Sequence, residues 1–127
     1  MSVWDGSISP AVWAEAATKQ VALAVTPWGS RRLTDARTAE SSGITTEDVE
    51  AICALFGRAD VDISRVRLAI VANQGWAIAQ QVEAGMRKHG VTTLVFNDVD
   101  TACVWLGVDP APTHATIADL RRELRTR

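Results

Sequence analysis

The chain has 127 residues, carries 13 Lys and Arg against 15 Asp and Glu, and is 47% hydrophobic. This length predicts one domain with a hydrophobic core of its own. A formal net charge of -2 excludes the strongly basic field that draws proteins to nucleic acid or to anionic membranes. The N-terminus lacks the basic and apolar segments of a signal peptide, and the longest apolar run, near 21–25, is too short to cross a bilayer. We therefore expect a cytoplasmic protein with no nucleic-acid or membrane partner.

Hydrophobic periodicity predicts strands that alternate with helices along the chain. In chain order, the expected elements are a short edge strand over 3–8, a helix over 10–23, a strand over 31–36, a helix over 45–56, a strand over 66–72, a helix over 75–89, a strand over 92–96, a helix over 98–106 and a last helix over 113–125. This order is typical of parallel strands joined by crossover helices. The predicted fold class is α/β, with a small mixed or parallel sheet covered by helices in a single domain over 1–127.

Helix ends carry the clearest local signals. Ser9 before Pro10 is typical of a helix start, and Thr45 with Asp48 three residues later resembles a capping box. Asn97 or Asp98 is expected to cap the helix over 98–106. Three glycines are expected to end helices, namely Gly57, Gly90 and Gly107.

The segment 66–72 is nearly continuous in apolar character, which predicts a strand covered on both faces. The segment 31–37 has weaker β propensity, and 39–43 is expected to be a polar loop. Four strand residues are expected to be buried, namely Leu68, Ile70, Val95 and Phe96.

The C-terminal region is expected to have a stiff connector at 110–112 before its helix. Helical spacing places Ile117, Leu120 and Leu124 inward and Arg121, Arg122 and Arg125 outward. Asp119 and Glu123 interleave with these arginines, so a solvated face is preferred to a nucleic-acid contact.

No catalytic or metal-binding constellation is present in the sequence. Cys53 and Cys103 lie among apolar neighbours, which indicates two buried thiols rather than a disulfide or a metal pair. His89 and His114 lie at helix ends, away from Cys, Asp or Glu at ligand spacing. The glycine patterns of nucleotide-binding loops and of hydrolase nucleophile elbows are absent. We therefore expect a non-enzymatic protein without a metal or cofactor.

Five tryptophans and no tyrosine make the aromatic content unusual. Trp13, Trp76 and Trp105 follow helical patterns and are expected to build core. Trp4 and Trp28 lie at element edges, where either edge packing or an interface role remains open.

Residues 33–37 and 43–49 resemble the strand and capped helix of the divergent, bacterial STAS-like proteins, named for sulfate transporters and anti-sigma-factor antagonists. The resemblance continues through 67–72 and ends in 95–106, similar to the closing strand and helix of that family. It is strongest over 31–107, so the terminal helix over 113–126 is an appendage and the N-terminal strand region is abbreviated. The resemblance implies a small α/β domain that binds proteins or small ligands and is not an enzyme.

In antagonist members of that family, a serine in an Asp-Ser-Ser-Gly loop is phosphorylated. Glu40, Ser41 and Ser42 with the next glycine are similar, and the resemblance places Ser41 at the modified position, with glutamate in place of aspartate. These three residues are the candidates for partner binding or phosphorylation.

Two functions remain open from the sequence. The first is a regulatory or scaffolding module that docks a partner protein or self-associates, with a homodimer as one form. The second is a small-ligand sensor at the carboxyl ends of the strands, with Asp35, Arg37, Asn73 and Trp76 as candidate ligand-binding residues. An apolar pocket beside Trp76 would favour the sensor, and a flat surface around Ser41 would favour docking.

Overall fold

A computed structural model describes residues 1–22, 30–58 and 66–125 of the chain. The elements are β1 (Ser2–Ser7), α1 (Pro10–Ala22), β2 (Ser30–Glu40), α2 (Thr46–Arg58), β3 (Val66–Ala72), α3 (Trp76–Lys88), β4 (Thr92–Phe96), α4 (Val99–Leu106) and α5 (Pro110–Arg125). The four strands form one sheet in the order β1-β2-β3-β4, and every neighbouring pair is parallel. The α/β prediction is therefore confirmed, including the N-terminal edge strand, and the sheet of the described strands is parallel rather than mixed.

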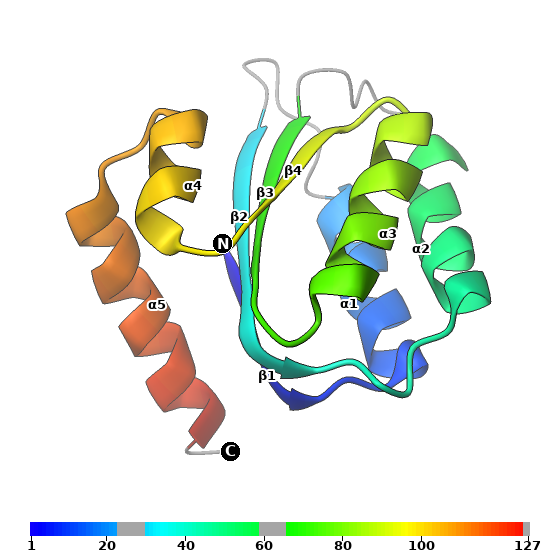
Figure 1. The fold of residues 1–127 in the computed structure, drawn as a ribbon, viewed down its shortest axis with the longest axis horizontal. Helices are drawn as coiled ribbons and strands as arrows, with labels where there is room; N and C mark the ends of the chain where they lie inside the picture. The colour runs from blue at the N-terminus through cyan, green and yellow to red at the C-terminus, as the bar shows by residue number, and fades with distance from the viewer. Residues whose placement is uncertain (23–29, 59–65, 126–127) are drawn as a thin grey trace.

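The helices form two layers on opposite faces of the sheet (Figure 1). α1, α2 and α3, which connect successive strands, cover one face, whereas α4 and α5 cover the other. Crossovers of one hand between neighbouring parallel strands place their helices on a single face, and α4 and α5 follow the last strand and are free to turn to the other.

β3 lies in the interior of the sheet and supplies core to both layers. Leu68, Ile70 and Ala72 pack in the cluster with α1, α2 and α3, while Ala69 and Val71 pack in the cluster with α4 and α5. This double burial explains the nearly continuous apolar run and confirms the predicted strand.

β2 is longer than its composition predicted. It runs to Glu40 rather than ending near residue 36, because Thr38, Ala39 and Glu40 pair with β1. The polar loop expected over 39–43 therefore begins only after Glu40.

Helix starts agree closely with the local signals. The Thr45 N–H donates to the Asp48 carboxylate at 2.9 Å, and the Asp48 N–H donates to the Thr45 hydroxyl at 3.1 Å, so the capping box is confirmed. Asp98 is the residue that caps α4, accepting from the Thr101 N–H at 2.8 Å.

One expected helix stop is wrong. α2 continues through Gly57 to Arg58, whereas Gly107 ends α4 at a positive φ of 74° as expected. A Cβ on Gly57 would lie 2.2 Å from Nδ1 of His89, so this glycine serves the packing of α2 against the end of α3.

The C-terminal helix corrects three expectations. It begins at Pro110 rather than after 110–112, because proline is suited to a first helical turn and Asp109 accepts the Ala111 N–H at 3.1 Å. Arg121 points inward rather than outward, and Leu124 is 37% exposed rather than inward. The side chain of Arg125 lies outside the described part of the chain.

β4 is the second edge of the sheet, so Val95 and Phe96 are half-buried rather than buried. Its outer backbone is covered by α3 instead of a fifth strand. Glu83 accepts the Val95 N–H at 2.8 Å, and Arg87 donates to the Thr93 carbonyl at 3.0 Å. Side chains that occupy edge groups in this way hinder pairing with another chain.

Both cysteines are free and buried, as expected. Burial raises the pKa of the Cys53 thiol to about 11, so it stays protonated at neutral pH. Trp13 and Trp105 are half-buried, but Trp76 is 37% exposed and does not build core. Trp28 lies outside the described residues. Among the helices that the structure describes, none combines the length and the apolar character needed to cross a membrane.

Candidate functional site

The candidate loop lies where β2 ends and the chain turns toward α2. The Ser41 carbonyl accepts the Ile44 N–H at 3.0 Å, and the Glu40 carboxylate accepts the Ser42 N–H at 2.9 Å. Hydrogen bonds from the side chain and the backbone of Ser42 hold the pKa of the Glu40 carboxyl below its usual range. Ser42 and Gly43 are exposed and Ser41 is half-buried. The loop is therefore held in one shape by its own polar groups.

Ser41 lies against the turn that joins β3 to α3. A Cβ on Gly75 would lie 2.9 Å from the Ser41 hydroxyl oxygen, closer than such atoms pack. Glycine at this position therefore allows the two connections to touch. The parallel pairing of β2 with β3 brings them together, since both connections leave the same end of the sheet.

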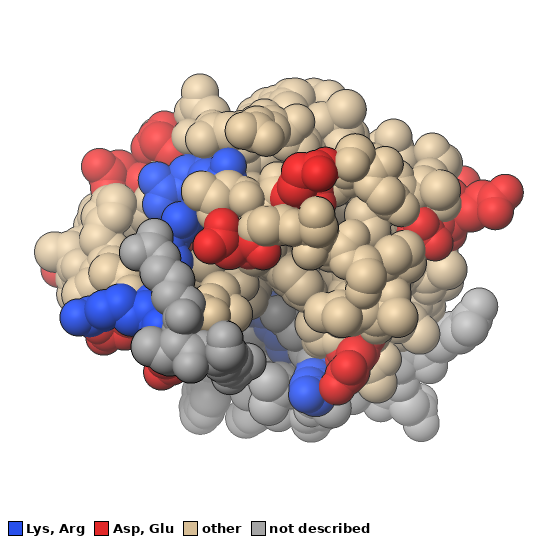
Figure 2. Space-filling view, turned by 90° about the horizontal axis from the view of Figure 1, so that it is seen from below, with Lys and Arg blue, Asp and Glu red and all other residues tan. Residues whose placement is uncertain are grey.

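The two connections border a hollow of about 320 Å³. Its lining comes from the loop and the start of α3: Ala39, Glu40, Ser41, Ser42, Ile44, Gln74, Gly75, Ala77 and Ile78. Figure 2, which looks onto this end of the molecule, shows mostly uncharged surface with separate acidic groups, and most of the Lys and Arg in view on the side of α4 and α5. The carboxyl end of a parallel sheet is the usual place for a binding site in such folds.

The N-terminus of α2, which is the positive end of the helix dipole, already has a carboxylate, that of Asp48. Asp48 already accepts the Thr45 N–H, and Glu40 accepts the Ser42 N–H on the other side of Ser41. A further negative charge on Ser41 would lie next to the carboxylate of Glu40, and Asp48 already occupies the N-terminus of α2, so the helix dipole would not hold it unopposed.

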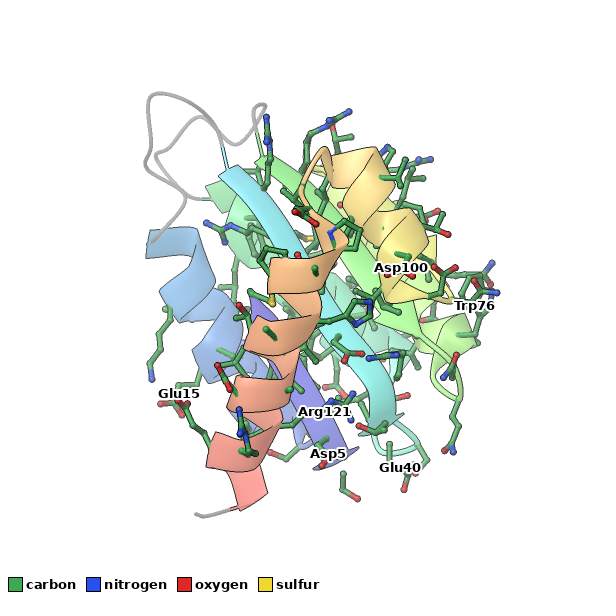
Figure 3. The ribbon with its side chains drawn as sticks, turned by 90° about the vertical axis from the view of Figure 1, so that its left-hand side faces the viewer. Asp5, Glu15, Glu40, Trp76, Asp100 and Arg121 are labelled. Carbon is green, nitrogen blue, oxygen red and sulfur yellow. The ribbon has the colours of Figure 1, made fainter. Side chains whose placement is uncertain are left out.

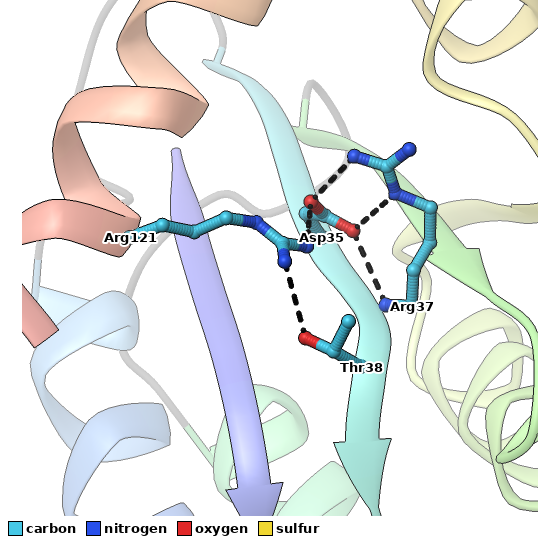
Figure 4. A network of polar contacts seen from close by, with 4 residues as sticks. All are labelled: Asp35, Arg37, Thr38 and Arg121. Atoms are coloured by element: carbon cyan, nitrogen blue, oxygen red, sulfur yellow. Dashed lines mark hydrogen bonds and ion pairs between the residues drawn. The ribbon is translucent and has the colours of Figure 1, made fainter. Parts of the chain in front are cut away.

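Asp35, a predicted ligand-binding residue, is fully buried in the layer of α4 and α5. Arg37 donates to both of its oxygens, at 2.9 and 3.0 Å, and Arg121 of α5 donates to one of them at 2.7 Å (Figure 4). Arg121 also reaches the Thr38 hydroxyl at 3.3 Å. Burial by itself would raise the pKa of Asp35, but the hydrogen bonds from Arg37 and Arg121 hold it below its usual value. Asp35 and Arg37 therefore anchor α5 to the sheet.

The side chains of the four predicted ligand-binding residues have different surroundings, since Asp35 and Arg37 bind each other in the layer of α4 and α5. Asn73 and Trp76 are exposed at the junction of β3 and α3, and Trp76 lies well apart from Arg121 in Figure 3. None of the four lines the hollow beside Ser41.

Two tertiary contacts escaped sequence reasoning. The interleaved Asp119 and Glu123 predict a solvated face for Arg121, but its spacing from Ile117 places both toward the sheet, and its partner Asp35 is 86 residues away in the chain. His114 meets Asp100 at 2.6 Å between α5 and α4, a pairing that local ligand spacing does not reveal. This pair is exposed, with 49% and 70% of the side chains accessible, and it links the two helices at the surface.

The described residues contain no group of three or more His, Cys, Asp or Glu side chains placed to hold a metal ion. The hollow beside Ser41 likewise has no histidine, cysteine or lysine in its lining. No family model, no curated protein and no solved structure matches the chain. Its function is therefore inferred from its own residues and their geometry.

Proposed function

We propose that this chain is a non-enzymatic, STAS-like regulatory module that binds a partner protein at the hollow beside Ser41. The resemblance over residues 31–107 and the α/β architecture with parallel strands support this proposal. The lining of the hollow also supports it, because it offers hydroxyl, amide and carboxylate groups to a partner and contains no histidine, cysteine or lysine among the described residues.

The observation that carries the proposal is the shape of this end of the sheet. The flat surface expected around Ser41 is not found, and the proposal instead takes the hollow there as the place where a protruding side chain of a partner enters. Ala77 and Ile78 supply apolar contact, and Ser42 and Gln74 supply hydrogen-bonding groups in the same lining. Protein interfaces combine apolar contacts with hydrogen-bonding groups in this way.

Ser41 is the proposed point of regulation. Its side chain is half-buried against Gly75, so a phosphate on its hydroxyl requires the loop to open. The carboxylate of the adjacent Glu40 disfavours the added charge. A modified loop therefore leaves the shape that the partner recognises.

The first test blocks the hollow without touching the loop. Ala77→Arg places a long side chain in the hollow, and Ala84→Arg places the same side chain at an exposed position of α3 that does not line it. Tagged wild-type and variant proteins are incubated with extract of the native host, and the bound proteins are compared by mass spectrometry. The proposal expects one partner to be retained by wild type and Ala84→Arg and lost with Ala77→Arg. Equal retention by both variants would contradict it.

The second test concerns the switch. Ser41→Asp should weaken binding of the partner found above, and Ser42→Asp, with the same charge at the exposed neighbouring position, should weaken it less. Calorimetric titration measures both affinities, and far-UV circular dichroism checks that each variant is folded. Unchanged affinity for folded Ser41→Asp would remove the switch. Sedimentation velocity separates docking of another protein from self-association through the same hollow.

The second candidate function, a small-ligand sensor, is favoured by a different feature. An apolar cavity lies under the Ser41 loop, between the sheet and α1 to α3. Its lining includes neither Trp76 nor the other three predicted residues, so the site is not the one that the sequence indicated.

A further inference from the structure

The cavity measures about 120 Å³. It is bounded by β1, β2 and β3 on one side and by α1, α2 and α3 on the other, and most of the side chains that line it are apolar. Residues from six elements thus line a partly open space that a fully packed core would fill.

Small side chains account for the space. Ala36 and Ala72 occupy neighbouring positions of β2 and β3, directly paired in the sheet. Ala17 of α1 and Ala79 of α3 lie in the same wall, and both are buried. Alanines on facing elements leave a void because the backbones of a sheet and its helices cannot approach closely enough to close it.

The chemistry of the walls selects an uncharged ligand. Among the described residues that line the cavity none is charged, and a bare charge placed there would lose its water without gaining a partner among them. The Thr34 hydroxyl is already hydrogen-bonded to Ser2 at 3.0 Å. The Ser41 hydroxyl has no hydrogen-bond partner among the residues that the structure describes, so it is free to bond a ligand.

We propose that this cavity binds a small, uncharged, mainly aromatic or aliphatic molecule with one hydroxyl or carbonyl group directed at Ser41. The volume sets the size, since an apolar cavity of about 150 Å³ engineered in another protein takes up benzene. Trp4 and Trp13 provide aromatic faces for such a molecule. The site does not depend on the proposed partner docking.

The cavity and the outer hollow share five residues, namely Ala39, Ser41, Ile44, Gly75 and Ile78. These residues form a common wall between the ligand space and the surface. A ligand that forms a hydrogen bond with the Ser41 hydroxyl therefore fixes the position of residues that also line the docking hollow. The occupied cavity favours one position of Ser41, which links ligand binding to the surface that a partner contacts.

The test uses benzene and phenol as probes of the full chain. Methyl resonances of Ile70 and Met86 report on the cavity in carbon–proton correlation spectra during titration. We expect saturable shifts at these methyls in wild type and in Ala84→Leu, where the added bulk is on the exposed side of α3. We expect the shifts to be lost in Ala79→Leu, where the added bulk fills the cavity. Ala17→Val fills it from α1 and replaces Ala79→Leu if that variant does not fold.

The role of Ser41 is tested by the ratio of the affinities for phenol and benzene. Ser41→Ala should weaken the binding of phenol by about fivefold more than the binding of benzene, as expected for the loss of one hydrogen bond. Absence of saturable shifts in wild type, or equal benzene binding by wild type and a folded cavity-filled variant, would overturn the site. An equal effect of Ser41→Ala on both probes would overturn the assignment of Ser41. These outcomes involve no partner protein, so they are separate from the failure of docking.

Discussion

The two faces of the sheet are built from the same strands but solve different packing problems. The face covered by α1, α2 and α3 packs through an apolar cluster and borders a cavity of about 120 Å³, and the buried side chain of Arg32 belongs to the same side of β2. The face covered by α4 and α5 includes a fully buried carboxylate, Asp35, held by two guanidinium groups. Alternation along β2 separates them, since Thr34 and Ala36 line the cavity and Asp35 points to α5.

The difference shows what fixes the packing of the helices on each face of the sheet. The face of α4 and α5 fixes the position of its last helix by an ion pair, because a buried carboxylate is tolerated only when its partners are in place. On the opposite face, the described residues that line the cavity are uncharged and leave room for a guest. The position of α5 is therefore fixed by charge pairing, whereas the space under α1, α2 and α3 is set by the volumes of the side chains that line it.

The largest effect is expected from Asp35→Ala. Removing one partner of a buried ion pair leaves the guanidinium groups of Arg37 and Arg121 without their acceptor, which should lower the free energy of unfolding by about 3–5 kcal/mol. Urea denaturation measures the change. The matched control is Asp119→Ala, whose pair with Arg122 is exposed and which should change stability by less than about 1 kcal/mol. Equal effects of the two substitutions would remove the contrast between the faces.

Acid should weaken the same face selectively. The pKa of Asp35 is lowered in the folded protein from 3.8, so its ionised form contributes stability that is fully present above that value. The contribution is lost as pH falls through the folded pKa. The stability gap between wild type and Asp35→Asn should be constant from pH 5 to pH 7, taken as about one unit or more above the unfolded pKa, and should narrow below it. A gap that widens in acid would show that the carboxyl is protonated in the folded state.

The next comparison places one substitution on opposite faces of β3. Ala69→Val adds two methyl groups to a packed layer, where alanine is 0% exposed, and should cost about 1–3 kcal/mol. Ala72→Val adds them to the wall of the cavity and should raise stability by about 0.5–2 kcal/mol. Thermal and urea denaturation of the pair measure both signs. Equal destabilisation would mean that the cavity does not accept a larger side chain.

The smallest effects are expected at helix starts, where the two faces should behave alike. Thr45→Ala removes the cap of α2 and Asp98→Ala removes the cap of α4, each at a cost of about 1 kcal/mol. These variants serve as a calibration, because both helices use exposed side-chain caps. A much larger loss at one cap would show that its loop contributes to the packing of that face.

Local patterns in the sequence determined most of the fold. The apolar run over 66–72, the capping box of Thr45 and Asp48 and the glycine stop at Gly107 each act through neighbouring residues, so their outcomes could be predicted. The α/β class followed from the alternation of strands and helices. The exposure of Ser42 and Gly43 also agreed with a short polar connection.

The candidate sites depended on residues that are distant in the chain. Gly75 reads as an ordinary turn residue until the parallel pairing of β2 and β3 places it against Ser41. Arg121 reads as a solvated arginine until α5 crosses the sheet above Asp35. Neither the contact of Ser41 with Gly75 nor that of Asp35 with Arg121 can be predicted from spacing in the sequence, because both result from the way the strands and helices pack.

The sequence by itself determined the order and type of the elements, the caps that begin α2 and α4, and the absence of nucleotide-binding glycine patterns and of nucleophile-elbow patterns. Only the tertiary structure decided which face Asp35 occupies, which helix clamps it, and where the alanines of four elements leave a cavity. Secondary structure follows from interactions within a few residues, whereas a void or a buried ion pair is a sum over side chains that meet only when the layers are packed.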